Sequence, residues 1–215
     1  MSSGAYSDSQ NAFEPSLNKH PLSFGQQAIW FLHQLAPESP AYNIPVAVRI
    51  RAELDIPAFR RAFQDLVNRH ASLRTTFEAP SGTPVQFVHG RMDVSFECID
   101  ISGWGEDQLT ERMLSQSHLP FNLEQGPLLR VTLFSRSKQE NFLMLVAHHI
   151  VADFWSLGLM MQELGIFYKA EKFCVPAPVA PVGWQYSDYA RSEAEMLAGP
   201  EGERLWKYWQ GQLSG

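Results

Sequence analysis

The chain has 215 residues, of which 45% are hydrophobic and 19% charged, as is usual for a soluble globular protein. Its net charge of −6, without a run of Lys or Arg, argues against a nucleic-acid-binding surface. The apolar run FLMLVA is far shorter than the ~20 residues of a membrane-spanning helix, and residues 1–19 do not resemble a secretory signal. Cys98 and Cys174 form no framework, so we interpret both as free thiols and predict a cytoplasmic protein.

Helical and strand patterns alternate along the chain after a polar leader. We predict a flexible tail or linker over residues 1–20 and one ordered unit over residues 21–215. Expected helices cover residues 24–35 (capped by Ser23), 56–70 (capped by Asp55), 104–119, 154–173, 184–197 and 203–213. Expected strands cover 41–54, two segments around the Pro-Ser-Gly turn at 80–82, and 93–101, 127–136 and 141–149. The pattern predicts an α/β fold, a two-layer sandwich of a mixed sheet packed by helices.

The stretch LVAHHIVADFWSLG places two histidines where an apolar strand gives way to a helix. Consecutive side chains on a strand point to opposite faces, so one imidazole is expected to face the interior and the other an opening. This asymmetry suits a division of labour between an inner, orienting histidine and an outer, working one. Asp153 follows four residues later, at the start of the helix.

Structural explanations compete with this functional one. Asp153 is also suited to be the N-cap of the following helix. Two histidines and a carboxylate are plausible metal ligands, but adjacent strand histidines diverge and no HExxH motif occurs, so we expect no metal. Tryptophans at helical spacing are interpreted as core residues: Trp30, Trp155, Trp206 and Trp209. The remaining histidines are interpreted as ordinary surface or core residues: His20, His33, His70, His89 and His118.

Four motifs, in order, resemble the condensation domains of nonribosomal peptide synthetases. HHIVADFWS is similar to the HHxxxDGxS signature, and LSFGQQAIWFL to the opening SxAQxRxWxL motif. RHASLRTTF is similar to RHExLRTxF, and YSDYA to YxDYA. A lone HHxxxD would be weak evidence, because related acyltransferases carry it, whereas four ordered motifs across nearly the whole chain are specific.

This resemblance implies a chloramphenicol-acetyltransferase-like half-domain. Residues 21–215 would form the N-terminal subdomain, cut from a longer chain, and the C-terminal subdomain would be a separate partner. The implied reaction joins an acyl or peptidyl thioester on one carrier protein to the amine of an aminoacyl group on another. Both substrates would be carried on 4′-phosphopantetheine arms of carrier proteins, with no cofactor bound directly by this chain. Further implied partners are donor and acceptor carrier proteins and an adenylation domain, and the isolated half is expected to be inactive.

The resemblance also assigns roles to residues. It makes His149 the working residue, because an imidazole with an ordinary pKa of about 6.5 suits accepting or positioning the amine proton. His148 would be structural, and Asp153 would pair with Arg74; if buried, that pair would cost ~3–5 kcal/mol to break from one side. The start of the next helix would offer N–H groups to a developing oxyanion. Expected channel or motif residues are Phe154, Trp155, Ser156, Gly158, Ser23 and Gln26.

The chain also departs from the family pattern. Phe154 stands where the signature has glycine, Ala28 where the opening motif has arginine, and Ala71 where RHExLRTxF has glutamate. We interpret Phe154 as a subtype mark related to the incoming acyl group, including one from a polyketide carrier. The alternatives are a free-standing acyltransferase of the same superfamily and a non-catalytic carrier-recruitment module. The opening motif argues against an epimerization domain, and His148 against a heterocyclization domain, which carries aspartate there.

Overall fold

The computed structural model describes residues 18–80 and 82–214. The elements are β1 (Lys19–Pro21), α1 (Phe24–Leu35), β2 (Asn43–Ile50), α2 (Ile56–Arg69), a 3-10 turn η1 (Ala71–Arg74), β3 (Thr75–Glu78), β4 (Val85–Val88), β5 (Ser95–Asp100), α3 (Glu106–His118), β6 (Leu129–Ser137), β7 (Glu140–His148), α4 (Phe154–Phe173), α5 (Tyr186–Ala198) and α6 (Pro200–Leu213). Every predicted helix and strand is present, within a few residues of its expected bounds.

The strands form two sheets, whereas the sequence pattern suggested one. The larger sheet has the order β2-β7-β6-β5, with β5 and β6 parallel and the other pairs antiparallel. The smaller, antiparallel sheet has the order β1-β4-β3. β1 was not predicted from the sequence because it has only three residues, two of which lie inside the predicted tail. Residues 1–17 of that tail are outside the described part of the chain.

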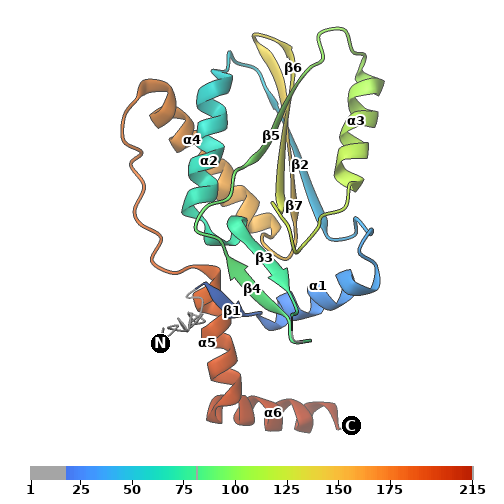
Figure 1. Ribbon diagram of the computed structural model, residues 1–215, viewed down its shortest axis with the longest axis vertical. Helices are drawn as coiled ribbons and strands as arrows, with labels where there is room; N and C mark the ends of the chain where they lie inside the picture. The colour runs from blue at the N-terminus through green and yellow to red at the C-terminus, as the bar shows by residue number, and fades with distance from the viewer. Residues whose placement is uncertain (1–17, 81, 215) are drawn as a thin grey trace, which may run out of the picture.

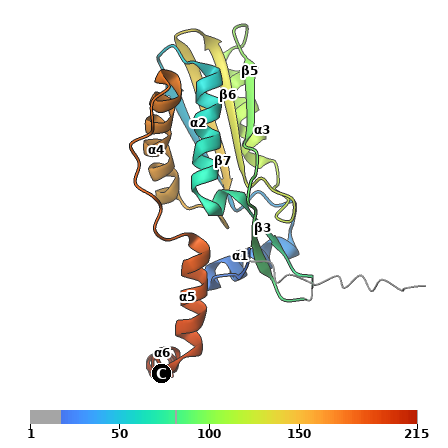
Figure 2. The ribbon, with the colours of Figure 1, turned by 60° about the vertical axis from the view of Figure 1, so that its left-hand side comes forward.

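Helices cover both faces of the larger sheet (Figures 1 and 2). On β7, Leu143, Leu145 and Ala147 belong to the cluster that includes the buried side chains of α2 and α4. The alternate residues Met144 and Val146 join a second cluster with α3 and α1. The predicted α/β sandwich is therefore confirmed, and α3 adds a helix on the second face. The alternation along β7 also decides where each histidine of the doublet points.

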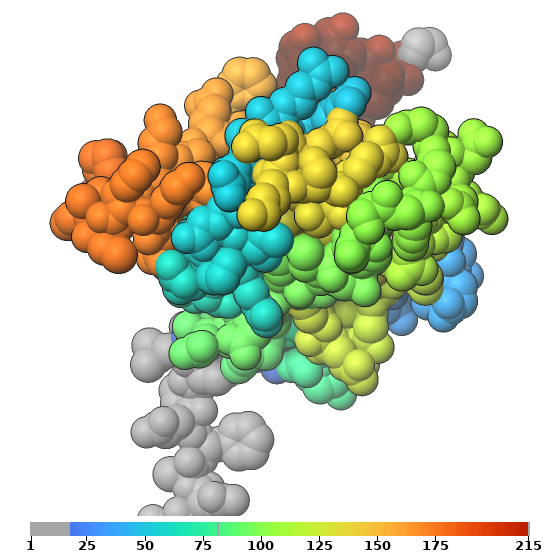
Figure 3. All heavy atoms as spheres, turned by 90° about the horizontal axis from the view of Figure 1, so that it is seen from above, coloured from blue at the N-terminus to red at the C-terminus, as the bar shows by residue number. Residues whose placement is uncertain are grey.

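The end of the molecule far from α5 and α6 carries the β6–β7 turn, which lies between the β2–α2 segment and α3 (Figure 3). At the opposite end, α1 crosses below the sheet and α5 leads to the projecting α6 (Figure 1). Residues 175–183 lie outside helices and strands and link α4 to α5. Among the described residues, no helix is long and apolar enough to cross a membrane.

The core assignment of the tryptophans is wrong for three of them. Trp155, Trp206 and Trp209 are 77%, 70% and 55% exposed, and α6 has no buried residue. Trp30 is partly buried and packs against the α3-side cluster. Helical spacing alone predicted a common apolar face, but it does not say whether another element covers that face. Here the apolar side of α6 has no neighbour within the described chain that covers it.

Candidate active site

The histidine doublet ends β7, and its two rings have different surroundings. His148 is the last residue of the strand and is 3% exposed, whereas His149 is exposed. The backbone N–H of His148 donates to the carbonyl of Leu128 (3.0 Å), and that of His149 donates to the carbonyl of Tyr42 (2.8 Å). The main chain is therefore held on both sides, and the predicted division into an inner and an outer imidazole is the arrangement observed.

His148 is enclosed by other rings. Its centroid lies 5.9 Å from that of His33, 6.3 Å from Tyr42 and 6.0 Å from Phe121. Burial, followed by the charges of His33, His149 and Arg130, lowers the pKa of His148 to about 4. Its Nδ1 faces a backbone N–H donor, that of Ile150 (3.2 Å), so the neutral ring carries its proton on Nε2. This geometry suits a neutral structural residue.

His149 has the opposite tautomer. Its Nδ1 lies 3.1 Å from the carbonyl oxygen of Ala152, which can only accept a hydrogen bond, so Nδ1 carries the proton. The lone pair of the neutral ring is therefore on Nε2. That nitrogen is left to accept a proton or a hydrogen bond from a bound molecule, as a general base requires.

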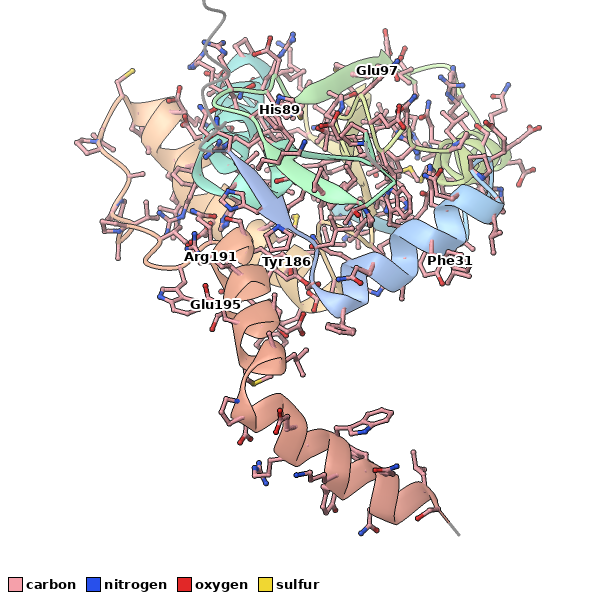
Figure 4. All side chains as sticks on the ribbon, turned by 60° about the horizontal axis from the view of Figure 1, so that its bottom comes forward. Phe31, His89, Glu97, Tyr186, Arg191 and Glu195 are labelled. Atoms are coloured by element: carbon pink, nitrogen blue, oxygen red, sulfur yellow. The ribbon has the colours of Figure 1, made fainter. Side chains whose placement is uncertain are left out.

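A pocket of about 350 Å³ surrounds this imidazole. Three parts of the chain meet there: the first turns of α1, the loop between β7 and α4 with the start of α4, and the start of α5. The lining residues are Gly25, Gln26, Ile29, His149, Ile150, Val151, Ala152, Asp153, Ser156 and Tyr186. Figure 4 shows labelled Tyr186 where α5 meets the beginning of α1. An imidazole with an open nitrogen at a pocket of this size can act on a small group delivered from outside.

The expected pair between Asp153 and Arg74 is not formed. Asp153 is exposed and caps α4, accepting hydrogen bonds from the backbone N–H and the hydroxyl of Ser156 at 2.7 and 2.6 Å. These bonds lower the pKa of Asp153. Arg74 instead donates to the carbonyl of His89, at the end of β4. The N-cap alternative is therefore correct, and the motif residues Asp153 and Arg74 act in separate places. Because Asp153 takes one of the first N–H groups of α4, the oxyanion role remains a prediction.

The other expected channel residues fall into two groups. Ser156 and Gln26 line the pocket, and Ser23, 1% exposed, lies behind it and contacts the Tyr186 hydroxyl (2.9 Å). The second group is exposed and does not line the pocket; it consists of Phe154, Trp155 and Gly158. Among the described residues, no three His, Cys, Asp or Glu side chains are grouped as a metal site.

A family model described as "Condensation domain" matches residues 16–215. The chain belongs to this family. A linear gramicidin synthase protein of Brevibacillus parabrevis is 40% identical over 199 residues, which are 91% of this chain and 3% of that protein. This condensation-domain chain therefore spans only a small part of the relative that it matches.

Solved structures agree on the fold. The starter condensation domain of the rhizomide synthetase RzmA superimposes with a TM-score of 0.82 at 23% identity, covering 92% of this chain and 50% of that chain. The X-domain in a complex with OxyB from teicoplanin biosynthesis superimposes with a TM-score of 0.82 at 28% identity, covering 94% and 44%. The condensation-domain chain thus corresponds to about half of each neighbour.

Two residues at the site were missed by the sequence analysis. Tyr186 lines the pocket, and its place as the first residue of the YSDYA motif was the available signal. His33 was interpreted as an ordinary residue but packs edge-on against His148. Burial lowers the pKa of His33 as well. Nothing in its local sequence distinguishes it, because the contact depends on how α1 crosses the end of β7.

Proposed function

We propose that this chain is the N-terminal half of a nonribosomal peptide synthetase condensation domain that forms an amide bond. The amine nitrogen of a carrier-bound aminoacyl group attacks the carbonyl carbon of a carrier-bound acyl or peptidyl thioester. The new C–N bond forms as the C–S bond breaks, and the amine proton leaves with the pantetheine thiolate as a thiol. Both substrates are held on 4′-phosphopantetheine arms, and this chain itself binds no further cofactor.

The observation that carries the proposal is the tautomer of His149. The Nδ1–H group is engaged by the Ala152 carbonyl, which leaves the Nε2 lone pair at the pocket to receive the amine proton or to orient the amine. A thioester is already activated, so correct placement of the amine supplies much of the rate enhancement. A neutral His148 behind it places no positive charge next to the imidazole that receives this proton.

The partners follow from the same proposal. The second half of the domain supplies the other wall of a channel at His149, consistent with structural neighbours about twice as long. Donor and acceptor carrier proteins deliver the substrates, and an adenylation domain loads the acceptor carrier. Phe154, 76% exposed at the start of α4, does not line the pocket of this half. In the proposed complete domain it borders the channel and influences the choice of acyl group. A cytoplasmic location belongs to the same proposal.

A recruitment module is the second candidate function. It is favoured by the likeness to the X-domain, which was solved in a complex with OxyB. Recruitment needs an exposed surface and no basic nitrogen in a pocket, so the open Nε2 of His149 favours the catalytic candidate. A free-standing acyltransferase is a third possibility that the same experiment addresses.

Reconstitution of the complete domain with loaded donor and acceptor carriers tests these candidates. The wild-type domain should transfer the acyl group to the acceptor carrier, as detected by mass spectrometry of the intact carriers. His149→Ala should cut this transfer sharply while circular dichroism remains that of the folded protein. Full turnover by His149→Ala would refute the catalytic role, and no turnover by the wild type would favour recruitment. The isolated 215 residues should transfer little, because one wall of the channel is missing.

A further inference from the structure

In the loop that follows the histidine doublet, both backbone polar groups of Ile150 form hydrogen bonds to side chains. The backbone N–H of Ile150 donates to Nδ1 of His148 (3.2 Å), and its carbonyl accepts from Nε2 of Gln26 (3.1 Å). Ile150 and Gln26 are each 3% exposed. Two buried side chains from different elements therefore fix the main chain one residue after His149.

Gln26 is itself immobilised. Its Oε1 accepts the backbone N–H of Ser23 (3.1 Å), which closes the capping box of α1, and lies 3.4 Å from the amide nitrogen of Gln86. The backbone N–H of Gln26 donates to the Ser23 hydroxyl oxygen (3.2 Å). The capping box satisfies backbone groups only at the start of α1. The hydrogen bond from Nε2 of Gln26 to the Ile150 carbonyl is additional, and it links α1 to a residue 124 positions further along the chain. The first turn of α1 thus acts as a rigid support for the loop.

The segment that Gln26 fixes is the one that orients the imidazole. The Ala152 carbonyl, which holds Nδ1–H of His149, lies two residues beyond Ile150 in the same short loop. A shift of this loop would move that carbonyl away from the Nδ1–H group of His149. The ring would then no longer be held in the tautomer whose Nε2 lone pair is free. We infer that Gln26 is a positioning residue for His149, acting through the Ile150 carbonyl; this inference rests on the proposed function.

Removal of the amide donor would leave a buried carbonyl without its partner. The loop would then rearrange to recover a hydrogen bond, because an unsatisfied buried acceptor is unfavourable. Small displacements of a catalytic group are costly, since a misplacement of about 1 Å reduces rate by about 100-fold. The loss should fall on kcat rather than on KM, because in this role Gln26 acts on the orientation of His149 and not on the affinity for the carriers.

The test uses the complete domain with loaded carriers and three variants. Gln26→Met has a similar shape but neither donor nor acceptor, and Gln26→Asn keeps an amide that is one methylene too short to reach Ile150. Gln27→Met is the matched control, because Gln27 neighbours Gln26 and its side-chain amide donates to the Leu22 carbonyl (3.1 Å) rather than to the loop after His149. The measurements are kcat and KM for amide formation, and the tautomer of His149 from the ¹⁵N chemical shifts of its ring.

We expect Gln26→Met and Gln26→Asn to lower kcat by about 10- to 100-fold with KM changed less than about twofold. The ¹⁵N spectrum should change from the Nδ1–H form to a mixture of tautomers, whereas Gln27→Met should leave both measurements as in the wild type. A folded Gln26→Asn with wild-type kcat, or a lower kcat with an unchanged tautomer, would overturn the inference. If Gln26→Met does not fold, Gln26→Asn decides. Failure of the proposed function is distinct, because the wild type would then form no amide.

Discussion

Replacement of Asp153 by alanine separates the two roles considered for this carboxylate. In the structure it caps α4 through two hydrogen bonds from Ser156 and is exposed. Loss of such a cap costs about 0.5–2 kcal/mol. Breaking a buried ion pair with Arg74 from one side would instead cost about 3–5 kcal/mol. For a chain of this size, a loss of 1 kcal/mol lowers Tm by about 2–4 °C, so the two roles predict separable changes.

The assay is urea unfolding of the protein and of four variants: Asp153→Ala, Asp153→Asn, Arg74→Met and the double variant Asp153→Ala with Arg74→Met. Asp153→Asn keeps the accepting oxygen and should lose only the charge–dipole part of the cap, about 0.3–1 kcal/mol. Because Asp153 and Arg74 do not touch, the double variant Asp153→Ala with Arg74→Met should be additive within about 0.5 kcal/mol. A loss above about 3 kcal/mol for Asp153→Ala, together with a coupling energy above about 1 kcal/mol, would refute the N-cap assignment.

Three further predictions concern stability. The pKa of His148 is about 4 in the folded protein and about 6.5 in an unfolded chain, so between these pH values the unfolded chain binds the proton more readily than the folded protein does. The free energy of unfolding should therefore fall as pH drops from about 6.5 to about 4. His148→Gln should reduce this pH dependence in urea unfolding. Glu163→Gln removes the charge that Arg69 contacts at 3.0 Å and should lower the free energy of unfolding by about 1.5–3 kcal/mol in the same assay. An unchanged free energy of unfolding would show that this ion pair does not stabilise the packing of α2 on α4. Ser23→Ala removes both the α1 cap and the contact with Tyr186, so it should destabilise by about 1 kcal/mol and raise hydrogen exchange at the start of α5; unchanged exchange would contradict that contact.

The regular elements could be predicted because each leaves a local signal. The caps Ser23 and Asp55 mark the starts of α1 and α2, and the apolar alternation of β7 marks a buried strand. The division into two sheets could not be predicted, since β1 is short and strand partnership depends on distant pairing. Gly82, at φ +82°, closes the expected turn after Ala79, although Ser81 lies outside the described residues.

The candidate site was predictable to a similar extent. The period of two along a strand was enough to assign the opposite faces of His148 and His149. Motif resemblance suggested a partner for Asp153, but the N-cap position of that residue satisfied its carboxylate locally. The YSDYA motif was a local signal for Tyr186, but its contact with Ser23 depends on how α5 packs beside α1. The contact of His33 with His148 depends on how α1 crosses the end of β7, and no local pattern carries that information.

The most direct test of the central claim is a crystal structure of the complete domain with a stable pantetheine analogue that bears an acceptor amine. The account predicts that the amine nitrogen lies within about 2.6–3.2 Å of Nε2 of His149, with Nδ1 still held by the Ala152 carbonyl. An amine bound away from this pocket, or a His149 ring turned so that Nε2 faces the protein interior, would contradict it.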